Sequence, residues 1–301
     1  MKFNINITTP ANQAAVFFMI LGVNIIVFSL FITLSAEMLF ENLYTADPLL
    51  YINALTQIGV FGLTTFECSL LFWNKRSMNY LQINKGISVW ECFFLICIAV
   101  ISLPALSHII TWNEGIKFPQ FMSSIEAWMR GKEDAAVKTT TLLLAGKSVQ
   151  VLFINLLVIA IIPSVCEEFL FRGFLITWFK KQISNIHVVV FISACAFSAI
   201  HLQFYGFVPR LLMGLYLGYL FVWTGSIWAC IFAHFINNSM TVIISYLFNN
   251  QIIDTEYQNF GNVGNNYLLI GMSVVLTTVC IYFLYRKRIY KVEKSVKASI
   301  F

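Results

Sequence analysis

The sequence predicts an all-α polytopic membrane protein, and its composition and the length of its apolar runs carry that prediction. Hydrophobic residues make up 59% of the 301 positions and charged residues only 11%, against roughly 45–50% and about 25% in soluble globular proteins. A soluble fold of this size could not shield that much apolar surface from water. The apolar residues also form runs close to the roughly 20 residues that a helix needs to cross a bilayer. Composition therefore excludes a soluble enzyme.

Eight runs are predicted as transmembrane helices. They cover residues 15–39, 49–73, 87–110, 149–171, 185–203, 209–224, 226–248 and 267–285. The chain then divides into N-terminal transmembrane helices (1–111), an extramembrane loop (112–148), a helix-bundle core (149–248), and a last helix with a basic tail (249–301).

The basic residues predict how the chain is oriented. With eight spans both termini lie on one side, and placing them inside puts most of the 19 Lys and Arg residues in the cytoplasm, as the positive-inside rule requires. We expect a multi-pass protein of the cell (inner) membrane, N-in and C-in, whose surroundings are membrane lipid and which does not bind nucleic acid. Six of the basic residues lie in the C-terminal tail: Arg286, Lys287, Arg288, Lys291, Lys294 and Lys297.

The loop at 112–148 is predicted to contain an amphipathic helix on the membrane surface. Ser123 and Glu126 have the spacing of a capping box, and Ile125, Trp128 and Met129 recur at helical spacing. The segment 174–183 is expected to form a second interfacial helix.

Charged residues are concentrated at the end of the fourth span. Glu167, Glu168 and Arg172 follow directly on an apolar run, and charged groups inside a membrane commonly mark function. Glu168 and Arg172 are i,i+4 neighbours and should pair, while Glu167 points elsewhere and suits a general base. Pro163 should kink this helix and free a backbone carbonyl. The alternative is a buried Glu–Arg pair that serves packing alone, which would leave Glu167 unexplained.

Two later spans add histidines and an asparagine. His201 ends the fifth span with Phe197 one turn earlier, and His234 and Asn238 share a face of the seventh, with Asn237 directed elsewhere. The simpler interpretations are that His201 lies at the membrane interface, and that His234 and Asn238 take part in an inter-helix hydrogen bond that holds the bundle together.

Together these side chains suit hydrolysis of an amide. A carboxylate and two imidazoles can activate water directly or hold a divalent metal such as zinc, with Glu167, His201 and His234 as candidate ligands. Asn238 and Arg172 could stabilise an oxyanion. The sequence has neither an HExxH nor a GxSxG motif.

The three groups resemble, in order, the EExxxR, FxxxH and HxxxN motifs of the CAAX protease and bacteriocin-processing (CPBP, Abi) family of intramembrane proteases, similar to type II CAAX prenyl endopeptidases. The motifs read Glu167 to Arg172, Phe197 to His201 and His234 to Asn238. The resemblance covers 149–248 and implies a catalytic core there that cuts a peptide or membrane-protein substrate. It implies that Glu167 activates water with the help of His201, that Glu168 and Arg172 support the site, and that His234 and Asn238 bind the substrate carbonyl and the oxyanion.

Two other functions fit the same residues less well. Intramembrane Glu and His also make proton relays, so a proton-coupled transporter is one alternative; the inverted repeats typical of such transporters are missing from the sequence. A non-catalytic immunity or scaffold protein is the other.

One geometric question also follows from the spans, because His201 falls near the outer end of its span and Glu167 near the cytoplasmic third of its own. Either the fifth span starts deeper or the fourth breaks at Pro163.

Overall fold

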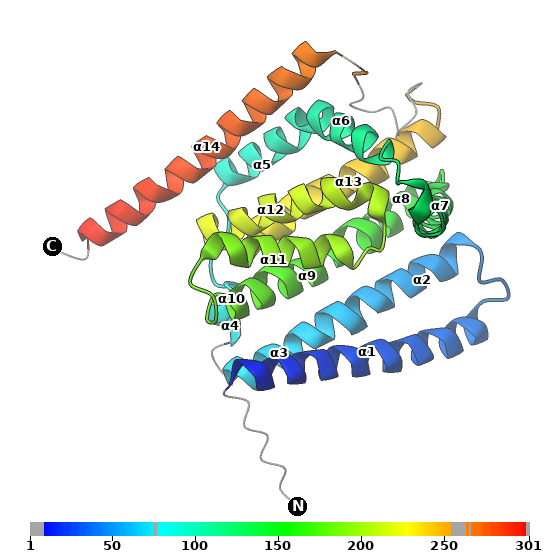
Figure 1. Ribbon diagram of the computed structural model, residues 1–301, viewed down its shortest axis with the longest axis horizontal. Helices are drawn as coiled ribbons and strands as arrows, with labels where there is room; N and C mark the ends of the chain where they lie inside the picture. The colour runs from blue at the N-terminus through cyan, green and yellow to red at the C-terminus, as the bar shows by residue number, and fades with distance from the viewer. Residues whose placement is uncertain (1–8, 75–76, 254–262, 265, 299–301) are drawn as a thin grey trace, which may run out of the picture.

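The chain folds into a bundle of helices. The structure, a computed structural model, describes residues 9–74, 77–253, 263–264 and 266–298, and within these ranges all regular elements are helical. Most helices lie alongside one another, and α7 (Ser123–Leu144) is seen end-on across one end of the bundle (Figure 1). The predicted all-α fold is confirmed.

In the described residues, six helices are long and apolar enough to cross a membrane, and a bent pair makes up to seven. The six are Pro10–Leu39 (α1), Ala46–Trp73 (α2, Ala46–Thr56, and α3, Thr64–Trp73), Val149–Phe179 (α8, Val149–Asn155, through α9, Ile162–Glu168, to α10, Thr177–Phe179), Phe204–Thr224 (α12, Phe207–Thr224, with a preceding turn), Ile227–Asn249 (α13) and Tyr267–Arg286 (within α14, Tyr267–Ala298). The bent pair is α5 (Val89–Ile101) and α6 (Leu103–Glu114).

The prediction of eight spans fails at the fifth. Helix α11 (Ile186–Ala199) has only 14 residues, a length of about 21 Å against the roughly 30 Å of a hydrocarbon core. His201 follows directly after this short helix. The placement of His201 near the outer end of a full span therefore fails, because α11 is too short to be a full span.

The helix that carries Glu167 is not a regular α-helix. Wider π-helical turns occur at 156–161 and 169–176, on either side of α9. A third lies at 57–63, between α2 and α3, and begins with Gln57. Turns of this kind are rare and are often found at functional sites. They set the rotation of the side chains on the two helices that meet at Glu167.

The bend between α5 and α6 is stabilised by a side chain from another helix. These helices meet at 46°. The Ser273 hydroxyl of α14 donates to the Ile101 carbonyl at 2.6 Å and accepts from the Ala105 N–H at 3.3 Å. Residues 101 and 105 have the spacing of a helical hydrogen bond, so Ser273 is inserted into the helix's own ladder, a known cause of kinks.

Two glycines let α12 approach α11 closely. A Cβ atom on Gly214 would lie 2.9 Å from the Ala194 backbone, and one on Gly218 would lie 2.8 Å from Val190. Gly214 and Gly218 form a small-xxx-small pair, which permits close helix packing in membranes. This contact places the α12 backbone beside the buried Arg172, described below.

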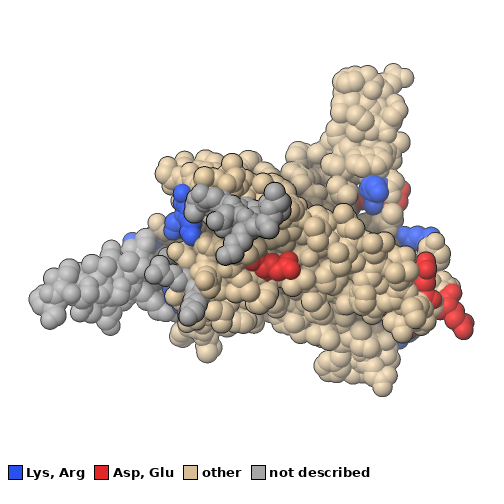
Figure 2. Space-filling model, turned by 90° about the horizontal axis from the view of Figure 1, so that it is seen from below, with Lys and Arg blue, Asp and Glu red and all other residues tan. Residues whose placement is uncertain are grey.

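The surface fits a bilayer. Most of the face in Figure 2 is uncharged, and its charged residues lie mainly toward the ends, with one acidic residue near the middle. α1 begins and α14 ends at the same side of the bundle (Figure 1), as expected for termini on one side. Lys2, Lys75 and Arg76, and the side chains of the basic tail beyond Arg286, lie outside the described residues.

Two local predictions are wrong. Helix α7 is present, but it begins at Ser123 itself after a 3-10 turn, so Ser123 and Glu126 form no capping box. The segment 174–183 is not a second interfacial helix, because the fourth helix continues through it to Phe179 and buries Phe174 and Trp178.

Candidate active site

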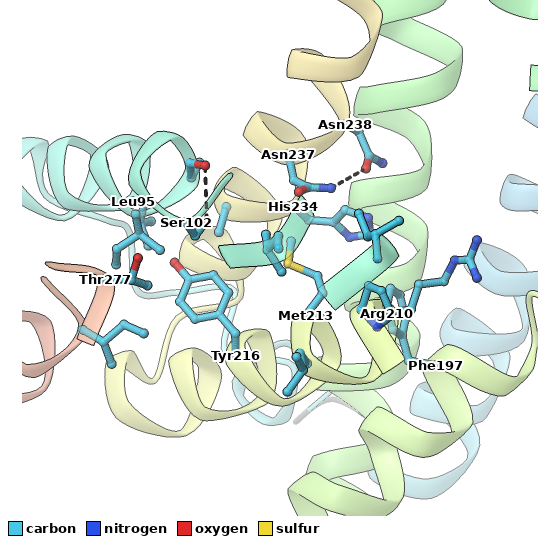
Figure 3. Close-up of a pocket in the computed structure, with 18 of the residues that line it drawn as sticks. Leu95, Ser102, Phe197, Arg210, Met213, Tyr216, His234, Asn237, Asn238 and Thr277 are labelled. Carbon is cyan, nitrogen blue, oxygen red and sulfur yellow. Dashed lines mark hydrogen bonds between the residues drawn. The ribbon is translucent and has the colours of Figure 1, made fainter. Parts of the chain in front are cut away.

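One cavity of about 400 Å³ brings together residues from all three predicted motifs. Glu167, His201, His234 and Asn238 line it, although they come from α9, the turn after α11, and α13. Figure 3 shows the cavity with His234, Asn238 and Phe197 at one part of its wall. Glu168 and Arg172 do not line the cavity and are fully buried.

The predicted Glu168–Arg172 pair is present and includes His234 as a third member. Glu168 Oε1 lies 2.6 Å from Arg172 Nη1 and 2.9 Å from His234 Nδ1. Arg172 Nη2 also donates to the Gly214 carbonyl at 3.3 Å, which the close α11–α12 contact brings within reach. The Arg172 guanidinium stacks 4.5 Å from the centre of the Phe197 ring. The motif residues thus form a network that holds His234 in one orientation.

Hydrogen bonds fix which nitrogen each histidine offers to the cavity. His234 Nδ1 faces the Glu168 carboxylate at 2.9 Å and His201 Nδ1 faces the Phe197 carbonyl at 2.9 Å. Both partners only accept hydrogen bonds, so Nδ1 carries the proton in each ring and Nε2 is left for the cavity. The Phe197 ring packs edge-on against both imidazoles.

Burial acts on the protonation of His201. Burial lowers the pKa of His201 below its ordinary value, although the nearby Glu167 carboxylate opposes that shift. Burial disfavours the charged imidazolium because it removes water from around it. A neutral His201 has a free lone pair on Nε2 and can accept a proton.

Glu167 is held by a residue that the sequence did not single out. Its side chain is 5% exposed, and Oε1 accepts a hydrogen bond from Gln57 Nε2 at 2.7 Å. Gln57 lies 110 positions earlier, at the π-helical turn between α2 and α3. Adjacent residues on a helix diverge by about 100°, so Glu167 faces the cavity and Glu168 faces the buried network.

The carbonyl freed by Pro163 binds Asn238. Proline lacks the N–H that would bond to the carbonyl four residues earlier, which is that of Ile159. Asn238 Nδ2 donates to the Ile159 carbonyl at 3.3 Å. The expectation that Asn237 points elsewhere is wrong: Asn237 lines the cavity and donates to Asn238 Oδ1 at 3.3 Å (Figure 3). Two amides rather than one therefore border the site.

The comparison with known families agrees with this geometry. Residues 149–240 match the family model described as type II CAAX prenyl endopeptidase Rce1-like. This segment is similar to Rce1-like domains. No curated protein and no solved structure matches the chain.

The Rce1-like domain contains every motif residue of the predicted site: Glu167, Glu168, Arg172, His201, His234 and Asn238. Rce1-like proteins are a protease family, so residues 149–240 resemble the domain of an intramembrane protease of the CAAX type. Gln57 and the cavity wall formed by α5, α6 and α14 lie outside the Rce1-like domain.

The three candidate metal ligands do not fit a metal site. In the part of the chain that the structure describes, no three His, Cys, Asp or Glu side chains are placed to hold one ion. We therefore derive no step through a metal.

Removing the Gln57 amide should slow cleavage without weakening substrate binding. In Gln57→Leu we expect kcat to fall about tenfold to a hundredfold at nearly constant KM, because a hydrogen bond to a charged group contributes about 1.5–3 kcal/mol. The kinetics and the pH profile of kcat, measured on a peptide reporter, check this. Gln13→Leu is the control, since Gln13 accepts a hydrogen bond from Trp178 Nε1 at 2.8 Å and does not line the cavity. A loss of kcat as large in Gln13→Leu would contradict a positioning role for Gln57.

Proposed function

We propose that the chain is an intramembrane endopeptidase that hydrolyses a peptide bond with water activated by Glu167 and His201. The observation that carries this proposal is the convergence of Glu167, His201, His234 and Asn238 on one cavity inside an Rce1-like domain. A carboxylate and an imidazole that line the same cavity are suited to take a proton from water.

The steps follow from the groups that line the cavity. Glu167 or His201 Nε2 takes a proton from water as the water oxygen attacks the carbonyl carbon. The carbonyl oxygen becomes an oxyanion. When the carbon–nitrogen bond breaks, that proton passes to the leaving nitrogen, giving an amine and a carboxylic acid.

We expect Asn238 and His234 to stabilise the oxyanion. One N–H of the Asn238 amide is used by the Ile159 carbonyl, and the amide has a second N–H. His234 turns Nε2 toward the cavity while Nδ1 is bonded to Glu168, and it can donate from Nε2 when that nitrogen carries a proton. Removing a single donor of this kind costs other hydrolases about 10²–10³ in kcat.

The proposal includes a substrate class and a location. The substrate we propose is a peptide or membrane protein, cut near the membrane face in peptide maturation, CAAX-like processing or bacteriocin immunity. We propose an inner-membrane location with both termini in the cytoplasm, which the shared side of the α1 start and the α14 end supports (Figure 1). Helix α7 would then lie on the outer surface.

Cleavage by purified protein tests the function. The protein is reconstituted in vesicles, incubated with a set of apolar reporter peptides, and the products are read by mass spectrometry. We expect cleavage at one bond, lost in His201→Gln and in Asn238→Ala. Cleavage that persists in both variants, or no cleavage of any peptide by wild type, would overturn the proposal.

The metal content of the protein should be low. Because three ligand side chains do not converge in the described residues, we expect less than one equivalent of any transition metal in active wild-type protein, measured by elemental analysis. The same analysis of His234→Ala provides the comparison. One equivalent of metal in wild type that disappears in His234→Ala would show that His234 is a metal ligand.

A further inference from the structure

The active-site cavity has a second part, away from the motif residues, in which two hydroxyl groups lack partners. We call this part the hydroxyl arm and define it by Leu95, Ile98, Tyr216, Thr277 and Ile281, all of which line the cavity. Figure 3 shows Leu95, Thr277 and Tyr216 together on the side opposite Phe197 and Arg210. Tyr216 Oη and Thr277 Oγ1 are both buried and form no hydrogen bond with the described residues.

Unpaired hydroxyls are unusual in such surroundings. Most of the cavity wall is apolar, and buried polar groups in proteins nearly always have partners. The neighbouring Thr278 shows the common solution, because its hydroxyl donates to the Val274 carbonyl at 2.8 Å. Thr277 does not use the corresponding carbonyl on its own helix.

The two hydroxyls constrain what can fill the arm. A buried hydroxyl left unsatisfied costs about 1–3 kcal/mol. A hydrocarbon chain would displace water from both groups and return no hydrogen bond. A polypeptide backbone offers both N–H donors and C=O acceptors, and a hydroxyl can pair with either.

The length of the cavity fits an extended peptide. Its lining residues on α5 and α6 run from Leu95 to Ile110. At 1.5 Å per residue these positions span about 20 Å of helix, the length of about six extended residues. The apolar lining would accept the side chains while the hydroxyls bind the backbone.

We propose that the hydroxyl arm binds the unmodified polypeptide backbone of the substrate and is not a pocket for an attached lipid. The inference rests on the proposed peptidase function, and it narrows the substrate class. A lipid-modified cysteine is thereby not required for recognition. Tyr216 and Thr277 are specificity residues in this scheme.

Direct binding tests the arm separately from catalysis. Glu167→Gln, in detergent, is titrated with a fluorescent apolar hexapeptide, and with the same hexapeptide carrying an S-farnesyl cysteine. Removing both hydroxyls, in Tyr216→Phe with Thr277→Val, should raise the Kd for the unmodified peptide about tenfold, since each neutral hydrogen bond contributes about 0.5–1.5 kcal/mol. In the same double variant, the ratio of the Kd for the farnesylated peptide to the Kd for the unmodified peptide should fall.

Matched controls lie one residue or one turn away. Thr278→Val removes a threonine hydroxyl from α14, and Tyr219→Phe removes a tyrosine hydroxyl from α12 that lies 2.8 Å from His187 Nδ1. Neither residue lines the cavity, so both should leave both Kd values unchanged. The single variants Tyr216→Phe and Thr277→Val are measured as well, so that failure of the double variant to fold does not end the test.

The outcomes separate the two proposals. An unchanged Kd for the unmodified peptide in all hydroxyl variants, or competition by farnesol alone, overturns the arm as a backbone site. Hydroxyl-dependent binding in a protein that cleaves no peptide overturns the peptidase function and leaves the arm intact. Glu167-dependent cleavage without hydroxyl-dependent binding supports the peptidase function and overturns the arm as a backbone site.

Discussion

Replacing Glu167 with Gln is expected to lower kcat for a reporter peptide by about 10²- to 10⁴-fold, the usual contribution of a general base. Gln has nearly the same shape as Glu and still offers an oxygen to the Gln57 amide, so the fold and KM should change little. It cannot take a proton from water. Single-turnover cleavage and the melting temperature in detergent are the two measurements.

A second intramembrane carboxylate provides the control. Glu67 Oε2 accepts a hydrogen bond from Asn24 Nδ2 at 2.9 Å, much as Glu167 accepts one from Gln57, but Glu67 does not line the cavity. Glu67→Gln should keep activity within about twofold of wild type. Full activity in Glu167→Gln would exclude Glu167 as the base, and equal losses in both variants would point to a general effect of removing buried charge.

Replacing Arg172 with Met should destabilise the fold by about 3–5 kcal/mol, because Glu168 would be left as a buried charge with only His234 beside it. Arg172 and Glu168 are both fully buried. The double variant Glu168→Gln with Arg172→Met removes both charges and should be more stable than Arg172→Met alone. The free energy of unfolding of the four proteins in a double-mutant cycle gives the coupling.

The exposed pair on α7 is the control for this cycle. Arg130 Nη2 lies 3.8 Å from Glu126 Oε1 and the Arg130 side chain is 42% exposed. Exposed pairs contribute little, so Arg130→Met should cost less than about 1 kcal/mol. If Arg172→Met were equally mild, the Glu168–Arg172–His234 network would not be a structural support.

The sequence predicts much of this site because the motifs lie on helices with a fixed period. The i,i+4 spacing of Glu168 and Arg172 predicts their pair, and the divergence of adjacent residues predicts that Glu167 faces another way. Pro163 predicts a freed carbonyl through its missing N–H. The identity of the donor, Asn238, depends on how two distant helices are placed and cannot be read from spacing.

Other features depend on tertiary contacts. Gln57 reaches Glu167 across 110 positions, in a part of the chain without any recognisable motif. The end of α11 could not be located because an apolar run continues past it. The sequence does contain one indication of a tertiary contact: Gly214 and Gly218 have the small-xxx-small spacing that permits the close helix contact beside Arg172.

The Ser273 hydroxyl makes the bend between α5 and α6 depend on the position of α14. Displacing α14 breaks the two hydrogen bonds that Ser273 makes, and Ile101 and Ala105 can then bond to each other as in a straight helix. This exchange would satisfy the Ile101 carbonyl and the Ala105 N–H, while Pro104, which lies between them and has no N–H, keeps a bend of its own. Ser102 and Leu106 beside this hinge, and Thr277 and Ile281 on α14, all line the cavity. Movement of the last helix would thus change the width of the cavity from two sides at once.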